Sequence, residues 1–177
     1  GRDDQAAEVP AYLSSSSARA NAGQIWLTAA ESAAITADVQ ADGNLLSVGL
    51  IAIAASGAGV VLENQVNTLV RAAVSNTRNS GVQASSGVTI SAQDTSKITA
   101  NAKAATFAAA VGVGAAVSVS ASRASNTIAS TVDAHATSAS ITTTSGNLSI
   151  DAAESATIET SAVASAQSDG LGVTLSG

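Results

Sequence analysis

The stretch "AAITADVQAD", Ala33 to Asp42, decides the fold class, because its apolar residues occupy every second position from Ile35 onward. A period of two places alternate side chains on the two faces of a β-strand, whereas a helix needs apolar residues three and four positions apart. The apolar face of this strand carries Ile35, Ala37, Val39 and Ala41. Such small side chains bury little surface in one strand, so several copies must stack to build a core.

The same alternation returns twice, in "SKITANAKAA" and in "ATIETSAVAS". A second short strand lies upstream of each copy, in "IWLTAAE", "VTISAQD" and "LSIDAAE", and each ends in an acidic residue. The acidic residues are Glu31, Asp94 and Glu154. We assign these large residues to the inner faces of the two strands: Ile35, Ile98, Ile158, Leu27, Ile90 and Ile150.

The chain is therefore a series of copies of one unit: a partial copy at 1–22, full copies at 23–85 and 86–145, and a partial copy at 146–177. Repeats of fixed period indicate a stacked array in which each copy completes its core against the next. We predict one all-β domain, 1–177, folded as a parallel β-solenoid with about three coils of roughly twenty residues in each repeat of roughly sixty residues. A tandem β-sandwich is the alternative.

Two long apolar runs, 45–62 and 104–121, approach the length of a membrane-spanning helix. Their glycines and β-branched residues, and the lack of a basic flank, argue against a membrane span. In the second run Val113, Val117 and Val119 alternate with small residues, so we predict strands buried on at least one face. The interval from Gly49 to Asn67 is longer than that from Gly112 to Asn126, which predicts a variable loop.

Composition narrows the class of function. The net charge is −6, and the seven basic residues are scattered along the chain: Arg2, Arg19, Arg71, Arg78, Lys97, Lys103 and Arg123. A nucleic-acid partner needs a basic patch, so we expect none. There is no cysteine, which fits a secreted bacterial repeat protein without disulfides. Residues 1–20 lack the pattern of a signal peptide, so a signal for export would lie outside this segment.

Candidate chemical groups are few. His135 is the one histidine, and with Asp133 it is too small a set for a metal site. Asp42 and Asp169 each precede a glycine, which predicts turns rather than calcium ligands. We predict no catalytic, cofactor-binding or metal-binding residue, no cofactor and no enzymatic activity.

The recurring carboxylates raise one alternative, because carboxylate pairs cleave glycosidic bonds. Asp38 follows Glu31 by seven residues. A carboxylate repeated in every copy is more typical of an architectural role than of an active site, which is built once. Asn67 and Asn126 also recur before threonine and predict either turn closure or an internal hydrogen-bonded ladder.

The repeat "VTISAQDTSKITANAKAATFAAAVGVGAAVSVSASRASNTIASTV" resembles the degenerate repeats of large bacterial surface proteins, the filamentous-haemagglutinin-like and leukotoxin-type filamentous adhesins. The resemblance covers nearly the whole chain. It implies an exported β-solenoid on the bacterial cell surface that acts as a structural or adhesive rod or filament. We expect other copies of the chain or adjoining repeats as partners, joined end to end, because the end coils of a solenoid would present unpaired backbone N–H and C=O groups. Surface glycans are a further expected partner. A polysaccharide-binding or polysaccharide-cleaving β-helix is the alternative function.

Overall fold

The computed structural model describes residues 6–77 and 81–177, apart from the side chains of 172–174, and Arg2 and Arg78 lie outside the described residues. Its described secondary structure consists of β-strands and no helix. The strands are β1 (Ala7–Ser14), β2 (Ala18–Ala20), β3 (Gln24–Glu31), β4 (Ala34–Ser75), β5 (Val82–Ala84), β6 (Gly87–Asp94), β7 (Lys97–Thr137), β8 (Ile141–Thr143), β9 (Asn147–Glu154) and β10 (Thr157–Ser176). The predicted all-β class is confirmed.

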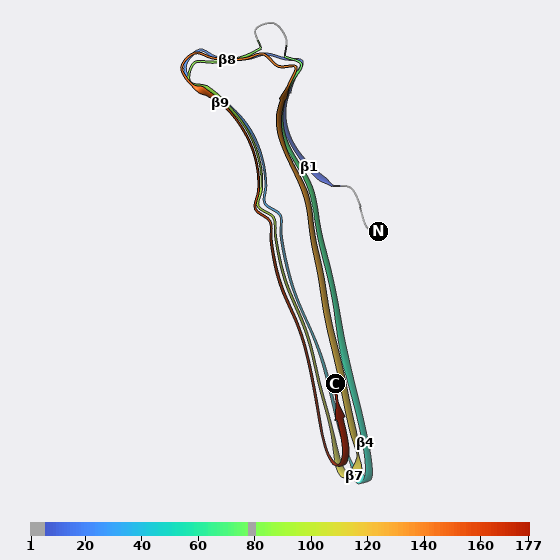
Figure 1. The fold of residues 1–177 in the computed structure, drawn as a ribbon. Coiled ribbons are helices and arrows are strands. Elements are labelled where there is room, and N and C mark those ends of the chain that lie inside the picture. The colour runs from blue at the N-terminus through green and yellow to red at the C-terminus, as the bar shows by residue number, and fades with distance from the viewer. Residues whose placement is uncertain (1–5, 78–80) are drawn as a thin grey trace. The chain divides into compact units, whose positions relative to one another are not determined.

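The strands form three sheets, with orders β1-β4-β7-β10, β2-β5-β8 and β3-β6-β9. The pairing is parallel and joins equivalent residues of successive repeats: Ile25 lies beside Val88, and Val88 beside Leu148. Each full repeat contributes one strand to each sheet. Figure 1 shows the strands of successive repeats running side by side. This parallel arrangement is compatible with a β-helix or solenoid, and it differs from the antiparallel pairing of a β-sandwich.

The predicted division of each repeat into about three coils is wrong. Coils of about twenty residues would pair residues about twenty apart, whereas the observed partners are about one whole repeat apart, as in Val82 and Ile141. The short segments between the strands are the corners at which one repeat passes from one sheet to the next.

The chain forms two compact units, each assembled from three separate segments. The first, here called the three-sheet unit, comprises Gly1–Ala34, Gln65–Lys97 and Thr127–Thr157. The second, here called the two-arm unit, comprises Ile35–Asn64, Ile98–Asn126 and Ile158–Gly177. Each is described by itself below.

The three-sheet unit has a core of branched aliphatic residues. Val70, Val82, Val88 and Ile90 are almost fully buried, and alanines fill the spaces between them. Leu27 is partly buried and packs against this core. Ile150 lies on β9, the end strand of its sheet, and is 42% exposed. The predicted inner face is therefore confirmed in the middle copy, whose strand has a neighbour on both sides.

In the two-arm unit each strand doubles back on itself (Figure 1). In β4 the Ser56 hydroxyl donates to the carbonyl oxygen of Gly43. In β7 the Ser118 hydroxyl donates to Thr106 Oγ1 at 2.6 Å. Residues 106 and 118 are both six positions from Gly112, which has a φ of +125° and forms the turn.

The inner face of the two arms carries alanine. Ile98 and the alternate residues Ala100, Ala102 and Ala104 are buried, as the alternation predicts. A cluster of buried alanines continues this face toward the turn: Ala52, Ala54, Ala108, Ala110 and Ala116. Of the other predicted isoleucines, Ile35 is half-buried and Ile158 is 46% exposed. Small side chains on both arms therefore build a thin core.

The two apolar runs are strands, and only one of their faces is buried. In the second run Ala116 and Ser118 are buried, whereas Val113 is 70% exposed and Val119 is 55% exposed. Near the turn the smaller residues thus occupy the inner face and larger apolar residues face outward, whereas farther along the first run Val60 and Leu62 are buried. The described part of the chain holds no helix long and apolar enough to cross a membrane.

The predicted variable loop between Gly49 and Asn67 is absent. The prediction aligned Asn67 with Asn126 because both precede a threonine, whereas in the structure Asn126 pairs with Asn64. Gly112 lies against the Gly49 carbonyl oxygen, 63 positions earlier, and Asn126 pairs with Asn64, 62 positions earlier. The arms after the turn therefore differ in length by one residue rather than four. The partner of Asn126 is Asn64 and not Asn67.

Candidate functional site: a polar pocket on sheet β2-β5-β8

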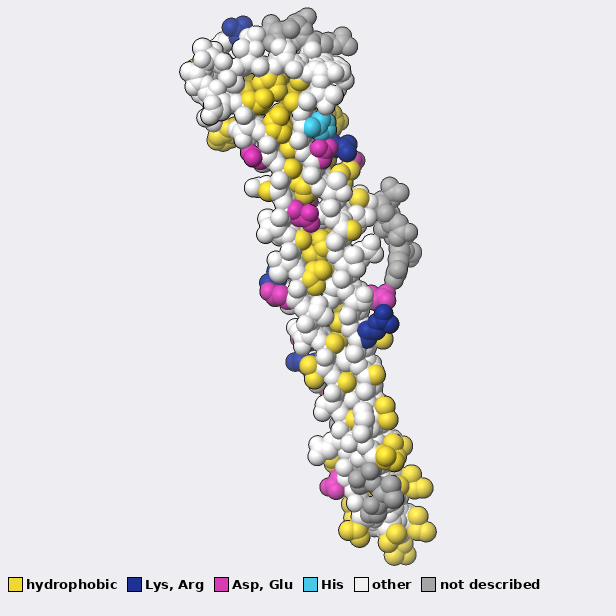
Figure 2. All heavy atoms as spheres, viewed as in Figure 1, with side chains coloured by type: hydrophobic (Ala, Val, Ile, Leu, Met, Phe, Trp, Pro, Cys, Tyr) yellow, Lys and Arg dark blue, Asp and Glu magenta, His cyan; other side chains and the backbone are white. Residues whose placement is uncertain are grey.

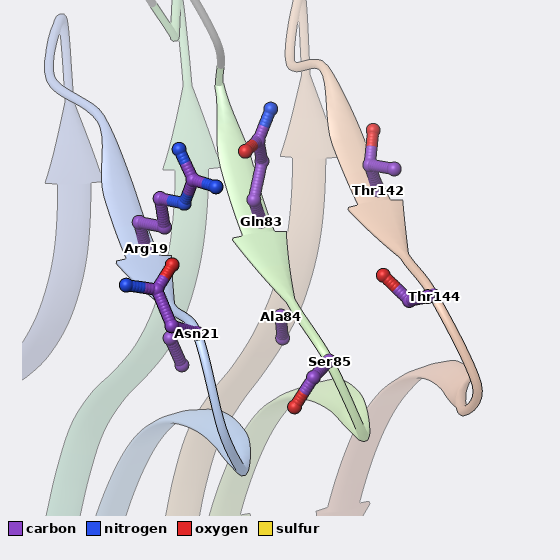
Figure 3. Close-up of a pocket in the computed structure, with 8 residues that line it drawn as sticks. Arg19, Asn21, Gln83, Ala84, Ser85, Thr142 and Thr144 are labelled. Atoms are coloured by element: carbon purple, nitrogen blue, oxygen red, sulfur yellow. The ribbon is translucent and has the colours of Figure 1, made fainter.

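A polar pocket of about 190 Å³ lies over the three short strands of the three-sheet unit (Figure 3). It is lined by Arg19, Ala20, Asn21, Gln83, Ala84, Ser85, Thr142 and Thr144. Pockets for drug-sized ligands typically measure about 300–1,000 Å³. The space therefore suits a small polar group or one end of a larger ligand.

Strand pairing brings the first row of lining residues together. Arg19, Gln83 and Thr142 occupy one register position of the parallel strands β2, β5 and β8. Their neighbours Val82 and Ala84 point into the core and are buried. Because side chains alternate along a strand, the three polar residues must point outward on one face. Figure 3 shows them standing side by side on successive strands.

The second row comes from the backbone just beyond these strands. The Ser85 amide donates to the Ala20 carbonyl oxygen, and the Thr144 amide donates to the Ala84 carbonyl oxygen, both at 3.1 Å. The Ser85 hydroxyl also accepts the Gly23 amide hydrogen at 2.7 Å. These bonds hold the rim of the pocket in register although it lies outside the strands.

The lining groups can bind a ligand rich in hydroxyl or anionic oxygens. Arg19 supplies the one positive charge among the described lining residues, and none of them is acidic. A guanidinium donates in a planar fork that matches a carboxylate or sulfate, while amides and hydroxyls both donate and accept. No carboxylate lines the pocket, so it offers binding groups without a general acid or base.

A second polar cluster is buried in the three-sheet unit around Asp94, which is 1% exposed. Its carboxylate accepts hydrogen bonds from the Thr68 hydroxyl at 2.9 Å, and from the Ser96 amide at 2.9 Å and hydroxyl at 2.5 Å. The Ser130 hydroxyl lies 2.8 Å from Thr68 Oγ1.

These bonds stabilise the charged form of Asp94. Burial by itself would raise the pKa of this carboxyl, but hydrogen bonds from Ser130, Ser96 and Thr68 outweigh burial and hold the pKa below its ordinary value of 3.8. The Asp94 carboxylate is closed to solvent, and its described partners are donors from β4, from β7 and from Ser96 in the segment between β6 and β7. It ties successive repeats together.

The recurring carboxylates occupy one register position, as Glu31 pairs with Asp94 and Asp94 with Glu154. Their burial differs: Glu31 is half-buried, Asp94 is buried and Glu154 is exposed. Asp38 is an exposed residue of β4 in the two-arm unit. The Asp94 carboxylate is closed to solvent, so it cannot be one of two carboxylates that face a substrate.

His135 lies within β7, near the end of the strand. Its Nδ1 lies 3.0 Å from Asp133 Oδ2, which also accepts a hydrogen bond from Arg71 Nε at 3.2 Å. Arg71 and Asp133 are both substantially exposed, and exposed ion pairs of this kind contribute about 0–1 kcal/mol. Among the residues described, no three histidine or acidic side chains converge as metal ligands.

The predicted asparagine ladder is present, but its first member is Asn64, three positions before the Asn67 that we predicted. Asn64 donates to Asn126 Oδ1 at 2.7 Å, and Asn126 donates to Thr160 Oγ1 at 2.6 Å. These bonds cross three successive repeats of the two-arm unit. Asn67 directly precedes Thr68, and Thr68 contacts Ser130, so this part of β4 lies beside Ser130 and not beside Asn126.

The turns predicted at Asp42 and Asp169 are wrong, because both residues lie within strands β4 and β10. Gly43 follows Asp42 for a different reason. A Cβ at this position would lie 2.8 Å from the carbonyl oxygen of Gly57 on the opposite arm. The glycine therefore permits close approach of two backbones and does not mark a reversal of the chain.

Comparisons with protein-family models, with curated proteins and with solved structures gave no match for this chain. The function is therefore argued from the residues and their geometry.

Proposed function

We propose that the chain is a segment of a parallel β-solenoid with one coil per repeat, serving as a structural or adhesive element of a large secreted bacterial surface protein. The resemblance to filamentous adhesin repeats supports the location. The observation that carries the proposal is the stacking of successive repeats in one register across all three sheets. Such stacking adds a coil without changing the architecture, so it suits an array of many repeats.

Burial supports end-to-end association of this element with further repeats or with other copies. Ile90 and Ile98 in the middle copy are fully buried, whereas their counterparts Ile150 and Ile158 are 42% and 46% exposed. Another coil stacked on β9 and β10 would cover these isoleucines and pair the open backbone N–H and C=O groups. We propose that association of this kind continues the stack.

Sedimentation velocity over a range of protein concentrations, with electron microscopy of the same samples, tests this proposal. We expect concentration-dependent growth into filaments. The double variant Ile150→Arg, Ile158→Arg places charges on the open face and should stop growth. The control Ser161→Arg changes an exposed residue of β10, the strand of Ile158, and should leave growth unchanged. A monomer at every concentration, or equal growth of both variants, would contradict end-to-end stacking.

The pocket favours a second function, binding of surface glycans. Arg19, Asn21 and Thr142 are exposed polar groups that match the hydroxyls and carboxylates of acidic sugars. The absence of a lining carboxylate favours binding over cleavage. Arg19→Ala should weaken retention on an immobilised acidic polysaccharide, whereas Arg123→Ala in the two-arm unit should not. Equal retention of the two variants would exclude the pocket as the binding site.

A further inference from the structure

The turn of the two-arm unit exposes large aliphatic side chains on its outer surface. Leu50 is 94% exposed and Ile51 is 84% exposed. We call this surface the aliphatic tip, and its residues are Leu45, Leu46, Val48, Leu50, Ile51, Ile53, Val111, Val113, Leu171 and Leu175. Figure 2 shows hydrophobic side chains gathered at the end of the unit where the strands turn.

The tip lies within uncharged sequence in all three copies. No Asp, Glu, Lys, Arg or His occurs in 43–62, in 104–122 or in 170–177. The three-sheet unit differs, because its outer strand faces carry Glu8, Arg71 and Asp133. Single exposed leucines are common on protein surfaces, but a contiguous apolar patch marks an interaction site.

The core does not require these residues. Alanines on the opposite face fill the space between the arms, so outward positions could carry Thr or Ser at no expense to packing. Three successive copies instead place Leu, Ile or Val there, and a Cβ on Gly112 would collide with the Gly49 carbonyl oxygen, so successive turns stack closely. The tip is therefore a built feature of the outer surface.

We propose that the aliphatic tip inserts into the interfacial layer of a lipid bilayer. The tip is a convex turn, so its side chains spread outward and two such turns would leave most of them in water. Fluid acyl chains conform to a protruding apolar surface of any shape. Insertion is shallow, because the backbone groups of an open strand edge cannot be satisfied deep in hydrocarbon.

This inference adds a partner to the proposed structural array and stands independently of it. A chain that stacks end to end could lack membrane affinity, and a monomeric chain could possess it. A negative result in the sedimentation test of stacking would therefore leave the vesicle-binding test of the tip unaffected, and the reverse also holds.

Co-sedimentation with phosphatidylcholine vesicles tests the inference. A zwitterionic lipid is chosen because the net charge of the chain is −6, so that apolar insertion is measured without charge attraction. The variant combining Leu50→Ser, Ile51→Ser and Val113→Ser should lose more than about tenfold in partitioning. The control Trp26→Ser removes a 72% exposed aromatic residue from the three-sheet unit and should keep the partitioning of the parent chain.

A fluorescent variant measures insertion directly and avoids the question of whether the triple variant folds. Trp26 is the single tryptophan, so Trp26→Phe combined with Leu50→Trp places the one indole at the tip. We expect its emission to shift to the blue with vesicles and to be quenched by brominated acyl chains. An unshifted emission, or equal vesicle binding of parent and triple variant, would overturn the proposal. So would a vesicle-independent dimer that the triple variant dissociates, because the occupant of the tip would then be a second copy.

Discussion

The two units use the same repeats to build cores of different thickness. In the three-sheet unit the inner positions hold valine and isoleucine as well as alanine, and the core also encloses the Asp94 carboxylate. In the two-arm unit most inner positions near the turn hold alanine, and opposite arms approach until Gly43 meets the backbone of Gly57. The size of the inner side chains therefore decides how far apart the facing strands lie.

The difference predicts opposite sensitivities to mutation. A core of larger side chains loses contacts when one is shortened, whereas a core of alanines between two close backbones has no room for a longer side chain. The following changes test this contrast, beginning with the largest expected effect.

Ile90→Ala should lower the free energy of unfolding by about 2–5 kcal/mol, because it leaves a cavity in the core of the three-sheet unit. Denaturant unfolding followed by circular dichroism measures the loss. Thr89→Ala, on the neighbouring outward position, should cost less than about 1 kcal/mol. A small loss for Ile90→Ala would mean that the three-sheet core is as adaptable as the surface.

Asp94→Ala should cost about 1–3 kcal/mol, because it leaves the donors of Thr68 and Ser96 buried without their acceptor. The parent chain should also lose stability in acid. Since the pKa of Asp94 is lower in the folded state than the ordinary 3.8, the unfolded chain takes up a proton first as the pH falls. The contribution is therefore present above about pH 3.8 and is lost below it, as the pH falls through the folded pKa.

Unfolding midpoints between pH 2 and pH 6 measure this dependence, with Asp94→Asn as the control that cannot ionise. We expect the acid-dependent part of the midpoint to shrink in Asp94→Asn, while the exposed Asp151→Asn retains it. Identical pH profiles in all three proteins would show that the hydroxyl cluster does not stabilise the carboxylate.

Ala108→Leu should destabilise the two-arm unit by about 1–3 kcal/mol, because the longer side chain must separate the closely packed arms. Ala105→Leu, on an exposed position of the same strand, is the matched control and should change stability by less than about 0.5 kcal/mol. The unfolding midpoints of the two variants give the comparison. A neutral Ala108→Leu would show that the arms separate easily and that alanine does not set their spacing.

The features that could be predicted from the sequence are those that depend on the local alternation of apolar and polar residues. The strand period identified the buried positions Ile90 and Ile98, and the matched acidic residues placed Glu31 and Asp94 in one register. The pairing partner of a strand is not a local property, so turn signals could not tell whether a repeat makes one coil or three. The burial of small rather than large residues after Gly112 was missed for a related reason, since hydrophobicity alone does not show which face points inward.

The pocket could have been found from a weaker signal. The strands β2, β5 and β8 read "ARA", "VQA" and "ITT", each with a polar residue between two inward positions. Alignment of these three short segments would have placed Arg19, Gln83 and Thr142 in one row. The strands are too short for their period to stand out, so only the repeat register reveals the pocket.

The smallest expected effect concerns the turns, where the two units again differ. The two-arm unit turns at a glycine, Gly112. The three-sheet unit has positive-φ glycines too, but it also places Ser15, Asn76 and Ser138 at φ values near +50°, a conformation that costs a residue with a Cβ about 1–2 kcal/mol. Ser15→Gly removes this cost but adds freedom to the unfolded chain, so the net gain should be about 0.4–1 kcal/mol. The adjacent Ser14→Gly lies in a strand and should lose about 0.5–1 kcal/mol, because only the second effect operates there. Unfolding midpoints of the pair should therefore move in opposite directions, and movement in the same direction would show that Ser15 does not hold a left-handed conformation in solution.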